Sequence, residues 1–155
     1  MTKSECPPEE IQRIAALCTT RWHRDYTRIK LRTDPAYAAV LREVSGTSLP
    51  LLDIGCGIGL LAMYLRGAGF DADVTGFDYD TGKIEAAKLM AQRSGFSGLH
   101  YAAGDARHEM PAFSGHVVIL DILQFFTSTE QDTLLALAAS RVAAGGRLNI
   151  RSGRC

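Results

Sequence analysis

Residues 51–59 read LLDIGCGIG, a short apolar run followed by glycines at three alternate positions. A continuous apolar run of this length is typical of a strand that is covered on both faces of a parallel sheet. In doubly wound α/β folds, adenosine-type ligands bind at a glycine-rich turn between such a strand and a helix. A side chain there would hold the ligand away from the backbone amides at the helix start. A tight turn whose glycines serve only packing is the alternative, but three alternate glycines exceed what such a turn requires.

The glycine spacing separates two classes of ligand. A dinucleotide fingerprint GxGxxG that begins at Gly55 requires a glycine where this chain has Leu60. The chain has GxGxG instead, and Asp53 lies two residues before the first glycine. A carboxylate beside the loop suits a ligand with an ammonium group better than one with a pyrophosphate. An NAD-dependent oxidoreductase is therefore an alternative that fits the pattern poorly.

Two further acidic residues follow predicted strands. Asp78 comes after the second one, 23 residues beyond Gly55, where a carboxylate can accept hydrogen bonds from both hydroxyls of a ribose. A helix cap is the alternative role, but Asp80 and Thr81 are better placed for it. Asp105 follows the third strand in the triplet GDA, and we expect it to accept a bond from an adenine amino group or to cap its own loop.

Around this loop the chain alternates between strand and helix patterns after residue 46. This alternation indicates parallel, right-handed βαβ units and a doubly wound sheet. A capping box of Ser128 and Gln131 is expected to start the last helix. The predicted strands are 49–54, 73–77, 99–103, 116–122 and 147–151, and the predicted helices are 60–66, 80–93 and a segment that ends before Gly145.

The first 46 residues predict a helical cap in front of this core. Prolines and acids at 7–10 are typical of a helix start, and an apolar face follows at the helical spacing, made of Ile11, Ile14, Ala15, Cys18 and Trp22. A second start at Asp34-Pro35 leads into another helix, and the segment 24–32 between them is rich in charge. We therefore expect a single domain of residues 1–155, with a cap at 1–46 and an α/β core at 47–155.

Composition narrows the possible partners and the location. The chain has 155 residues, and its 17 basic side chains balance 17 acidic ones, which makes nucleic acid an unlikely partner. It has no apolar run long enough to span a bilayer, and its start lacks the apolar stretch of a signal peptide, so we expect a cytoplasmic protein without a membrane partner. The four cysteines and four histidines are scattered. We expect free thiols and no metal site.

The chain resembles the class I S-adenosylmethionine (SAM)-dependent methyltransferases. The residues that carry the resemblance are LLDIGCGIG at 51–59, Asp78, GDA at 104–106 and VVILDILQFF at 117–126, in the order and spacing of that family. It implies a Rossmann-like fold with a mainly parallel sheet in the strand order 3-2-1-4-5. It also implies that the cofactor is SAM.

The resemblance further implies a place for each candidate residue along the ligand. The loop would surround the methionine end of SAM, Asp78 would bind the ribose, Tyr79 would pack on the adenine, and the GDA triplet would approach the adenine edge. Asp121 would lie where the family often contacts the methionine amino group or the acceptor. The candidate cofactor residues are Asp53, Gly55, Cys56, Gly57, Gly59, Asp78, Tyr79, Asp105, Ala106 and Asp121.

The acceptor of the methyl group is harder to predict. The sequence contains no nucleophile–base pattern and no metal cluster, so we name no catalytic residue. Asp121, Gln124, Phe125 and Tyr26 are candidates to lie near the methyl group, although we favour packing roles for Tyr26, Trp22 and the pair Phe125-Phe126. A small molecule is the expected acceptor, and a protein acceptor stays open. A methyltransferase-like SAM-binding or scaffold protein without turnover is the alternative.

In the family, the sheet usually continues beyond the fifth strand, whereas this chain ends at residue 155. A sheet that stops there would expose unpaired backbone groups on its outer strand, and such an edge favours pairing with a second copy. We therefore expect a homodimer formed through that edge. Size-exclusion chromatography with light scattering that detects only monomer at high micromolar concentration would contradict this expectation.

Overall fold

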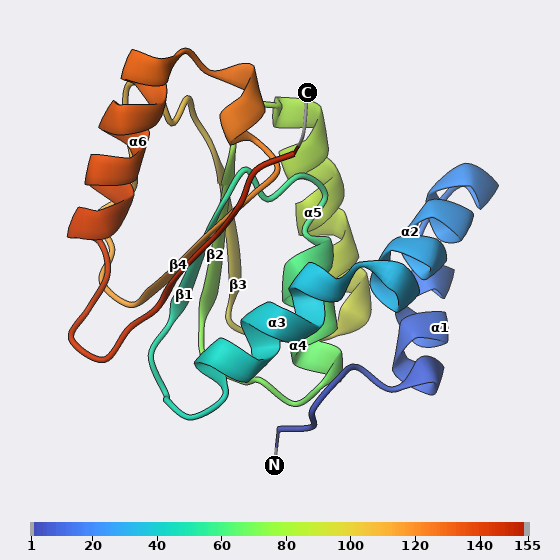
Figure 1. The fold of residues 1–155 in the computed structure, drawn as a ribbon. Coiled ribbons are helices and arrows are strands. Elements are labelled where there is room, and N and C mark those ends of the chain that lie inside the picture. Colours follow the sequence, from blue (N-terminus) through green and yellow to red (C-terminus); the bar gives the residue numbers. More distant parts are fainter. Residues whose placement is uncertain (1, 154–155) are drawn as a thin grey trace.

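The computed structural model describes residues 2–153, which form a parallel five-stranded sheet with helices on both faces (Figure 1). The strand order is β3-β2-β1-β4-β5, as predicted. In chain order, the elements are α1 (Pro8–Ala16), α2 (Arg21–Thr33), α3 (Pro35–Val44), β1 (Leu51–Ile54), α4 (Leu60–Gly67), β2 (Val74–Asp78), α5 (Thr81–Ser94), β3 (Leu99–Ala103), β4 (His116–Leu120), a 3-10 turn η1 (Leu123–Phe125), α6 (Ser128–Ser140) and β5 (Leu148–Arg151).

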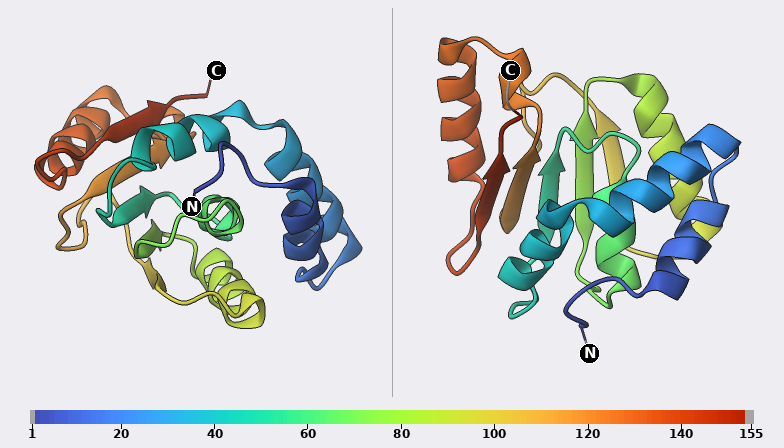
Figure 2. Two further views of the ribbon diagram at one scale, coloured as in Figure 1. Left: turned by 90° about the horizontal axis from the view of Figure 1, so that it is seen from below. Right: turned by 45° about the vertical axis from the view of Figure 1, so that its right-hand side comes forward.

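The helices divide between the two faces of the sheet (Figure 2). Helices α3, α4 and α5 lie on one face and α6 on the other, so the sheet is doubly wound, as the alternating pattern predicted. The direction of winding reverses between β1 and β4, because β1 pairs with both β2 and β4. In open α/β sheets, ligands bind beyond the carboxyl ends of the strands at such a reversal.

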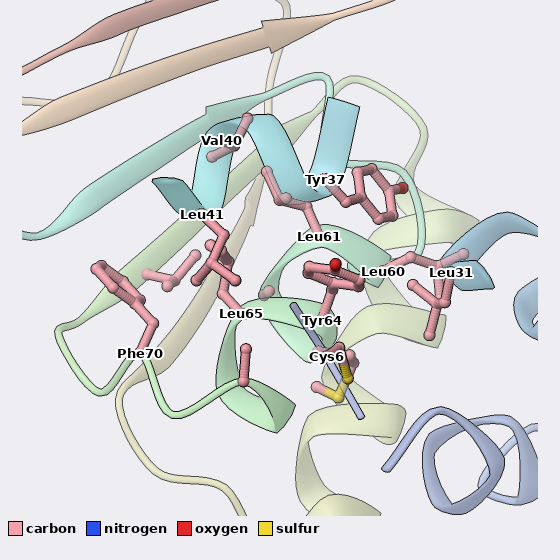
Figure 3. Packing of buried hydrophobic residues seen from close by; sticks show 14 of the residues in the cluster. Cys6, Leu31, Tyr37, Val40, Leu41, Leu60, Leu61, Tyr64, Leu65 and Phe70 are labelled. Atoms are coloured by element: carbon pink, nitrogen blue, oxygen red, sulfur yellow. The ribbon is translucent and has the colours of Figure 1, made fainter. Parts of the chain in front are cut away.

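Side chains that alternate along β1 contribute to two separate cores. Leu51 packs with α3 and α4, whereas Leu52 packs with α6. In the larger core, Leu41, Leu61 and Leu65 are almost completely buried between α3 and α4 (Figure 3). This packing fixes the N-terminal helices against the start of the sheet, and it explains why the α/β core carries a helical cap.

The N-terminal region differs from the prediction in one respect. The segment 24–32 belongs to a helix, α2, which begins after Thr20, and the Thr20 hydroxyl accepts a hydrogen bond from the His23 amide. The prediction that Trp22 continues the buried face of α1 is therefore wrong. Trp22 lies on α2 and is 67% exposed. The chain turns between the two helices, so the buried face that contains Ile11 and Ile14 does not continue into α2.

Two smaller predictions are corrected at the other end of the core. The capping box of α6 is formed by Thr127 and Glu130, one residue before the predicted pair. Strand β4 ends at Leu120, and the following residues turn into η1. Because β4 ends earlier than predicted, Asp121 lies in a turn at the carboxyl end of the sheet and not within the strand.

The edge strands of the sheet are β3 and β5. On β5, Leu148 and Ile150 remain 36% and 44% exposed. Pairing of this edge with a second copy stays a prediction. Among residues 2–153, none of the helices combines the length and the apolar character needed to cross a bilayer.

His116, at the start of β4, is a buried side chain that can titrate near neutral pH. Its side chain is completely buried, its Nδ1 accepts a hydrogen bond from the Arg147 amide at 3.0 Å, and its Nε2 lies 2.6 Å from the Thr47 hydroxyl. A nitrogen that accepts a backbone N–H cannot carry a proton. Burial, helped by nearby Arg147, accordingly lowers the pKa of His116 below its ordinary value of 6.5.

We expect the protein to lose stability as the pH falls below about 6.5, because the unfolded chain then binds a proton that folded His116 does not. His116→Asn retains an acceptor for the Arg147 amide without titrating. Thermal melts between pH 7.5 and 5 should show a fall in melting temperature of roughly 5 °C for the wild type and a smaller fall for the variant. Parallel curves would contradict this assignment.

Candidate functional site

A cavity of about 600 Å³ opens at the carboxyl ends of β1, β2 and β4, where the winding of the sheet reverses. This volume is typical of small-molecule sites. The cavity brings together nine of the ten predicted cofactor residues: Asp53, Gly55, Cys56, Gly57, Asp78, Tyr79, Asp105, Ala106 and Asp121. Gly59 is the predicted residue that does not line it.

The glycines of the loop have different roles. All three have positive φ, at 79° for Gly55, 56° for Gly57 and 85° for Gly59. A Cβ on Gly59 would lie 2.7 Å from the Tyr101 hydroxyl, whereas a Cβ on Gly57 would meet no protein atom within 4 Å. Gly59 is therefore needed for the turn and for packing against Tyr101, and Gly57 leaves its backbone open to the cavity.

Asp53 is the most unusual charge of the site. It lies on the central strand β1, is only 4% exposed and lines the cavity. Within the described residues, neither a hydrogen bond nor an ion pair compensates its carboxylate. Burial, together with the negative charge of Asp78, raises the pKa of Asp53 from 3.8 to about 7. A carboxylate in this state favours a cation beside it.

The Asp78 carboxylate organises the glycine loop. Its Oδ2 accepts a hydrogen bond from the Gly57 amide, and its Oδ1 accepts one from the Asp80 amide, both at 2.9 Å. Asp78 still lines the cavity with part of its side chain exposed, so free lone pairs remain for a ligand. The capping role that we assigned to Asp80 is confirmed, because its carboxylate accepts a bond from the Lys83 amide at the start of α5.

The Asp105 loop forms the neighbouring wall. The Asp105 carboxylate accepts bonds from the side chain of Arg107 at 2.7–3.1 Å and from its amide at 2.9 Å. These bonds to the Arg107 side chain hold the pKa of Asp105 at about 2. The loop-capping alternative is therefore realised. Tyr79, which is 77% exposed, presents a free aromatic ring at the rim.

The opposite wall comes from the N-terminal helices and from the turn after β4. Helices α2 and α3 contribute Tyr26, Lys30 and Tyr37 to the lining, and we call the segment from α2 to α3 (residues 21–44) the lid. Tyr26 stacks on Trp22 at the surface, with 5.4 Å between ring centroids. The prediction that Tyr26 and Trp22 pack against the core is therefore wrong.

The two phenylalanines after β4 separate. Phe126 packs against the core beneath α6, as predicted, whereas Phe125 lines the cavity and is 77% exposed, contrary to its predicted packing role. The 3-10 turn η1 directs the Phe125 side chain toward the cavity and is followed by Phe126, whose side chain faces the core. Gln124 donates a hydrogen bond from Nε2 to the Asp121 carbonyl and so supports the same turn.

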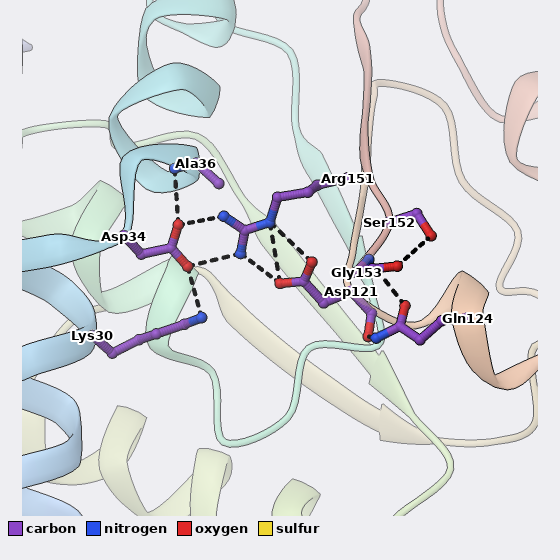
Figure 4. Close-up of polar contacts among 8 residues, drawn as sticks. All are labelled: Lys30, Asp34, Ala36, Asp121, Gln124, Arg151, Ser152 and Gly153. Atoms are coloured by element: carbon purple, nitrogen blue, oxygen red, sulfur yellow. Dashed lines mark hydrogen bonds and ion pairs between the residues drawn. The ribbon is translucent and has the colours of Figure 1, made fainter. Parts of the chain in front are cut away.

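Sequence reasoning missed the polar cluster beside Asp121. Arg151, at the end of β5, binds the carboxylates of both Asp121 and Asp34, and Lys30 pairs with Asp34 at 2.6 Å (Figure 4). The Asp34-Pro35 signal identified the cap of α3. Nothing local in the sequence connects that cap to a strand 117 residues later.

The site is suited to binding and alignment more than to covalent catalysis. Cys56 is a free thiol in the loop, but burial, together with Asp53 and Asp78, raises its pKa, so it is a poor nucleophile. Over residues 2–153, His, Cys, Asp and Glu side chains form no cluster that could hold a metal ion. The arrangement offers an unobstructed loop at Gly57, a carboxylate that can accept bonds from ribose hydroxyls and an uncompensated carboxylate in one cavity.

Comparison with known proteins gives a family match. The family described as "Methyltransferase domain" matches residues 51–146. Among curated proteins, the ribosomal protein L11 methyltransferase of Cupriavidus taiwanensis is 36% identical over 101 residues, which cover 63% of this chain and 30% of that protein. The enzyme of the same name from Burkholderia ambifaria is 33% identical over 98 residues, with the same coverage. The chain thus spans about 30% of the length of these relatives.

Solved structures share the fold at low sequence identity. The PH0226 protein of Pyrococcus horikoshii OT3 aligns with a TM-score of 0.68 at 18% identity, over 87% of this chain and 56% of that one. Magnesium protoporphyrin IX methyltransferase of Synechocystis PCC 6803, crystallised with bound SAM, aligns with a TM-score of 0.62 at 21% identity, over 86% and 65%. These likenesses support the Rossmann-like fold.

Proposed function

The chain belongs to the methyltransferase domain family, and on this basis we propose that it binds SAM and transfers the methyl group to an acceptor. The observation that carries the proposal is the Asp53 carboxylate, which is buried and uncompensated beside the open backbone of Gly57. The ammonium group of an amino acid would supply the missing positive charge. SAM also contains a ribose and an adenine, and the cavity has residues suited to both, the Asp78 carboxylate and the Tyr79 ring.

We assign the residues of the cavity to three parts of this ligand. Asp53 and the loop residues Gly55, Cys56 and Gly57 would hold the amino-acid end, with the Asp53 carboxylate beside its ammonium group. Asp78 would accept bonds from the ribose hydroxyls. Tyr79 would cover the adenine, and Ala106 would lie along its edge. Arg107 already donates hydrogen bonds to the Asp105 carboxylate. For Asp105 to contact the adenine, its carboxylate oxygens would have to accept from Arg107 and from the adenine amino group at the same time.

SAM supplies a methyl carbon that is already activated by a sulfonium. The acceptor forms a bond to this carbon as the carbon–sulfur bond breaks, and S-adenosylhomocysteine (SAH) leaves. The residues of this chain therefore have to align the two reactants and exclude water. The lid residues Tyr26 and Tyr37 and the turn at Phe125 would perform this role from the side opposite the loop. An acceptor that must lose a proton needs a base, and we assign that role to no residue.

Two classes of acceptor remain as proposals. The sequence led us to expect a small-molecule acceptor, and a cavity of about 600 Å³ is in the range of small-molecule sites. The names of the curated relatives favour a protein acceptor instead. These relatives are matched over about 30% of their length, so the regions that select their substrate can lie outside the match.

Isothermal titration with SAM and SAH tests the cofactor, and transfer of a labelled methyl group tests turnover. We expect binding in the micromolar range and labelling of either purified ribosomal protein L11 or the small-molecule fraction of a cell extract. Binding without any labelling would favour the alternative of a SAM-binding protein without turnover. If well-folded protein binds neither ligand, the proposal is wrong.

The loop glycines provide a separate test of the ligand's position. Gly57→Ala adds a methyl group that no protein atom opposes, so we expect a loss of roughly 1–2 kcal/mol in stability from the left-handed backbone. The same methyl group lies where the amino-acid end would approach the loop, so SAH affinity should fall at least about tenfold.

Gly59→Ala is the matched control on the same loop. It adds strain at φ 85° and a contact with Tyr101, so it should lower the melting temperature more than Gly57→Ala does. The SAH affinity of its folded fraction should change less. The reverse order of the two affinities, measured by titration at a temperature where both variants are folded, would show that the ligand does not approach Gly57.

A further inference from the structure

The ends of three distant segments meet in one charged cluster at the wall of the cavity (Figure 4). Arg151 at the end of β5 donates from Nη1 and Nη2 to the Asp34 carboxylate, at 2.5 and 2.8 Å. It also donates from Nε to Asp121 Oδ1 at 2.9 Å and from Nη2 to Asp121 Oδ2 at 2.5 Å. Lys30 completes the cluster through its bond to Asp34. One guanidinium thus joins two carboxylates.

The two carboxylates belong to different parts of the fold. Asp34 lies in the lid, where its Oδ1 also accepts the Ala36 amide and caps α3. Asp121 lies at the carboxyl end of the sheet, directly after β4. The side chain of Asp34 is only 6% exposed, and those of Arg151 and Asp121 are 33% and 34% exposed. Because these pairs are partly withdrawn from water, they tie the lid to the sheet more strongly than exposed pairs would.

Asp121 also has a strained backbone. Its φ is 62°, and it is the only residue other than glycine with positive φ in the described part of the chain. Such a conformation costs about 1–3 kcal/mol and persists only where its surroundings enforce it. Here Arg151 holds the carboxylate, while Gln124 donates to the carbonyl. The two contacts fix the direction of the Asp121 side chain beside the cavity.

Arg151 supplies one of the two positive charges that balance the carboxylates of the cluster. Lys30 and Arg151 balance Asp34 and Asp121, and both Asp residues are bound through the same guanidinium. The bonds to Arg151 hold the pKa of Asp34 well below its usual range. Without Arg151, Lys30 alone would balance the two carboxylates, and Asp121 would lose the guanidinium that ties it to the lid, so the join between lid and sheet would weaken.

We propose that Arg151 is a positioning residue, which closes the lid against the sheet and holds Asp121 toward the amino-acid half of the bound nucleoside. This inference rests on the proposed function, because it assumes a ligand in this cavity. Arg151 also lines the cavity, but its Nε, Nη1 and Nη2 atoms already donate to the two carboxylates, so it would act through Asp34 and Asp121. Its influence should therefore depend on whether the ligand carries the amino-acid group.

Paired titrations with SAH and 5′-methylthioadenosine test the inference. The second ligand has the same adenine and ribose but lacks the amino-acid group. Arg151→Met should weaken SAH binding at least about tenfold, equivalent to 1.4 kcal/mol, and 5′-methylthioadenosine binding less than about threefold. Arg151→Lys, which keeps the charge but not the fork of donors, should lie between the wild type and Arg151→Met in SAH affinity, and it replaces Arg151→Met if that variant does not fold.

Arg147→Met is the matched control. Arg147 precedes the opposite end of β5 and pairs with Glu43 at 3.6 Å in a half-exposed position, so its loss should change neither affinity. If Arg151→Met weakens both ligands equally, Arg151 has only a structural role, and the inference is overturned. Unchanged SAH binding overturns it as well. If the wild type binds neither ligand, the proposed function itself fails, and the inference falls with it.

Discussion

Asp53→Asn should make the protein more stable at pH 8 and, in the same variant, weaken its binding of SAM and SAH by about a hundredfold. The two effects have one cause, the burial of a carboxylate that has no partner among residues 2–153. A residue that decreases the stability of the fold and increases the affinity for a ligand is typical of a functional site.

The effect on stability has a defined pH dependence. The pKa of Asp53 is about 7 in the folded chain, against an ordinary value of 3.8, so the folded state holds a proton that the unfolded state has released between these pH values. The stability that the protonated form provides is complete below about pH 4 and is lost as the pH rises through 7. Asparagine does not titrate, so the advantage of the variant should be largest at pH 8 and small at pH 5.

The effect on binding has the opposite pH dependence. An ammonium group on the ligand favours the ionised carboxylate, so SAH affinity of the wild type should rise between pH 5.5 and 7.5. The affinity of Asp53→Asn should stay nearly constant over that range. 5′-Methylthioadenosine has no ammonium group, and its affinity should change little in either protein.

Thermal melts and titrations at four pH values measure both effects. Asp71→Asn, which alters an exposed carboxylate outside the cavity lining, is the control for a general change of charge. If Asp53→Asn lowers stability at pH 8, then Asp53 has an unidentified partner within the fold. If SAH binds the variant as tightly as the wild type, the ammonium group lies elsewhere.

Much of this site could be predicted because its chemistry is local. A glycine-rich turn and a carboxylate after a strand can be recognised from a few neighbouring residues. The sequence therefore predicted that Gly57 and Asp78 belong to one site, and in the structure both line the same cavity. The alternation of strand and helix predicted a doubly wound parallel sheet, and the resemblance to the methyltransferase family implied the order of its strands.

The remaining errors have physical reasons. Trp22 has the helical spacing of a buried face, but the turn before Thr20 starts a new helix and rotates the residue to the surface. Gly59 has the same pattern as Gly57, although the ring of Tyr101, which comes from a strand more than 40 residues away, occupies the space beside it. The cluster around Arg151 depends on contacts between segments that only the folded chain brings together.

Asp78→Ala should weaken the binding of SAM, SAH and 5′-methylthioadenosine alike, by about a hundredfold or more. All three ligands share the ribose, and a carboxylate that accepts two hydroxyls makes charge-assisted hydrogen bonds worth about 1.5–3 kcal/mol each. The substitution also frees the Gly57 amide, so the loop would lose part of its order. The uniform loss across ligands distinguishes Asp78 from Asp53, whose substitution should affect only the ligands that carry the amino-acid group.

Asp80→Ala separates loss of ligand contacts from damage to the fold. Asp80 lies two residues away and caps α5 through the Lys83 amide, so its loss should cost about 1 kcal/mol in stability and leave the three affinities nearly unchanged. Asp78→Ala should have a comparable cost in stability, because it frees two amides. If the two variants melt at similar temperatures and bind 5′-methylthioadenosine equally well, then Asp78 orders the loop without contacting the ribose, and the nucleoside must lie elsewhere in the cavity.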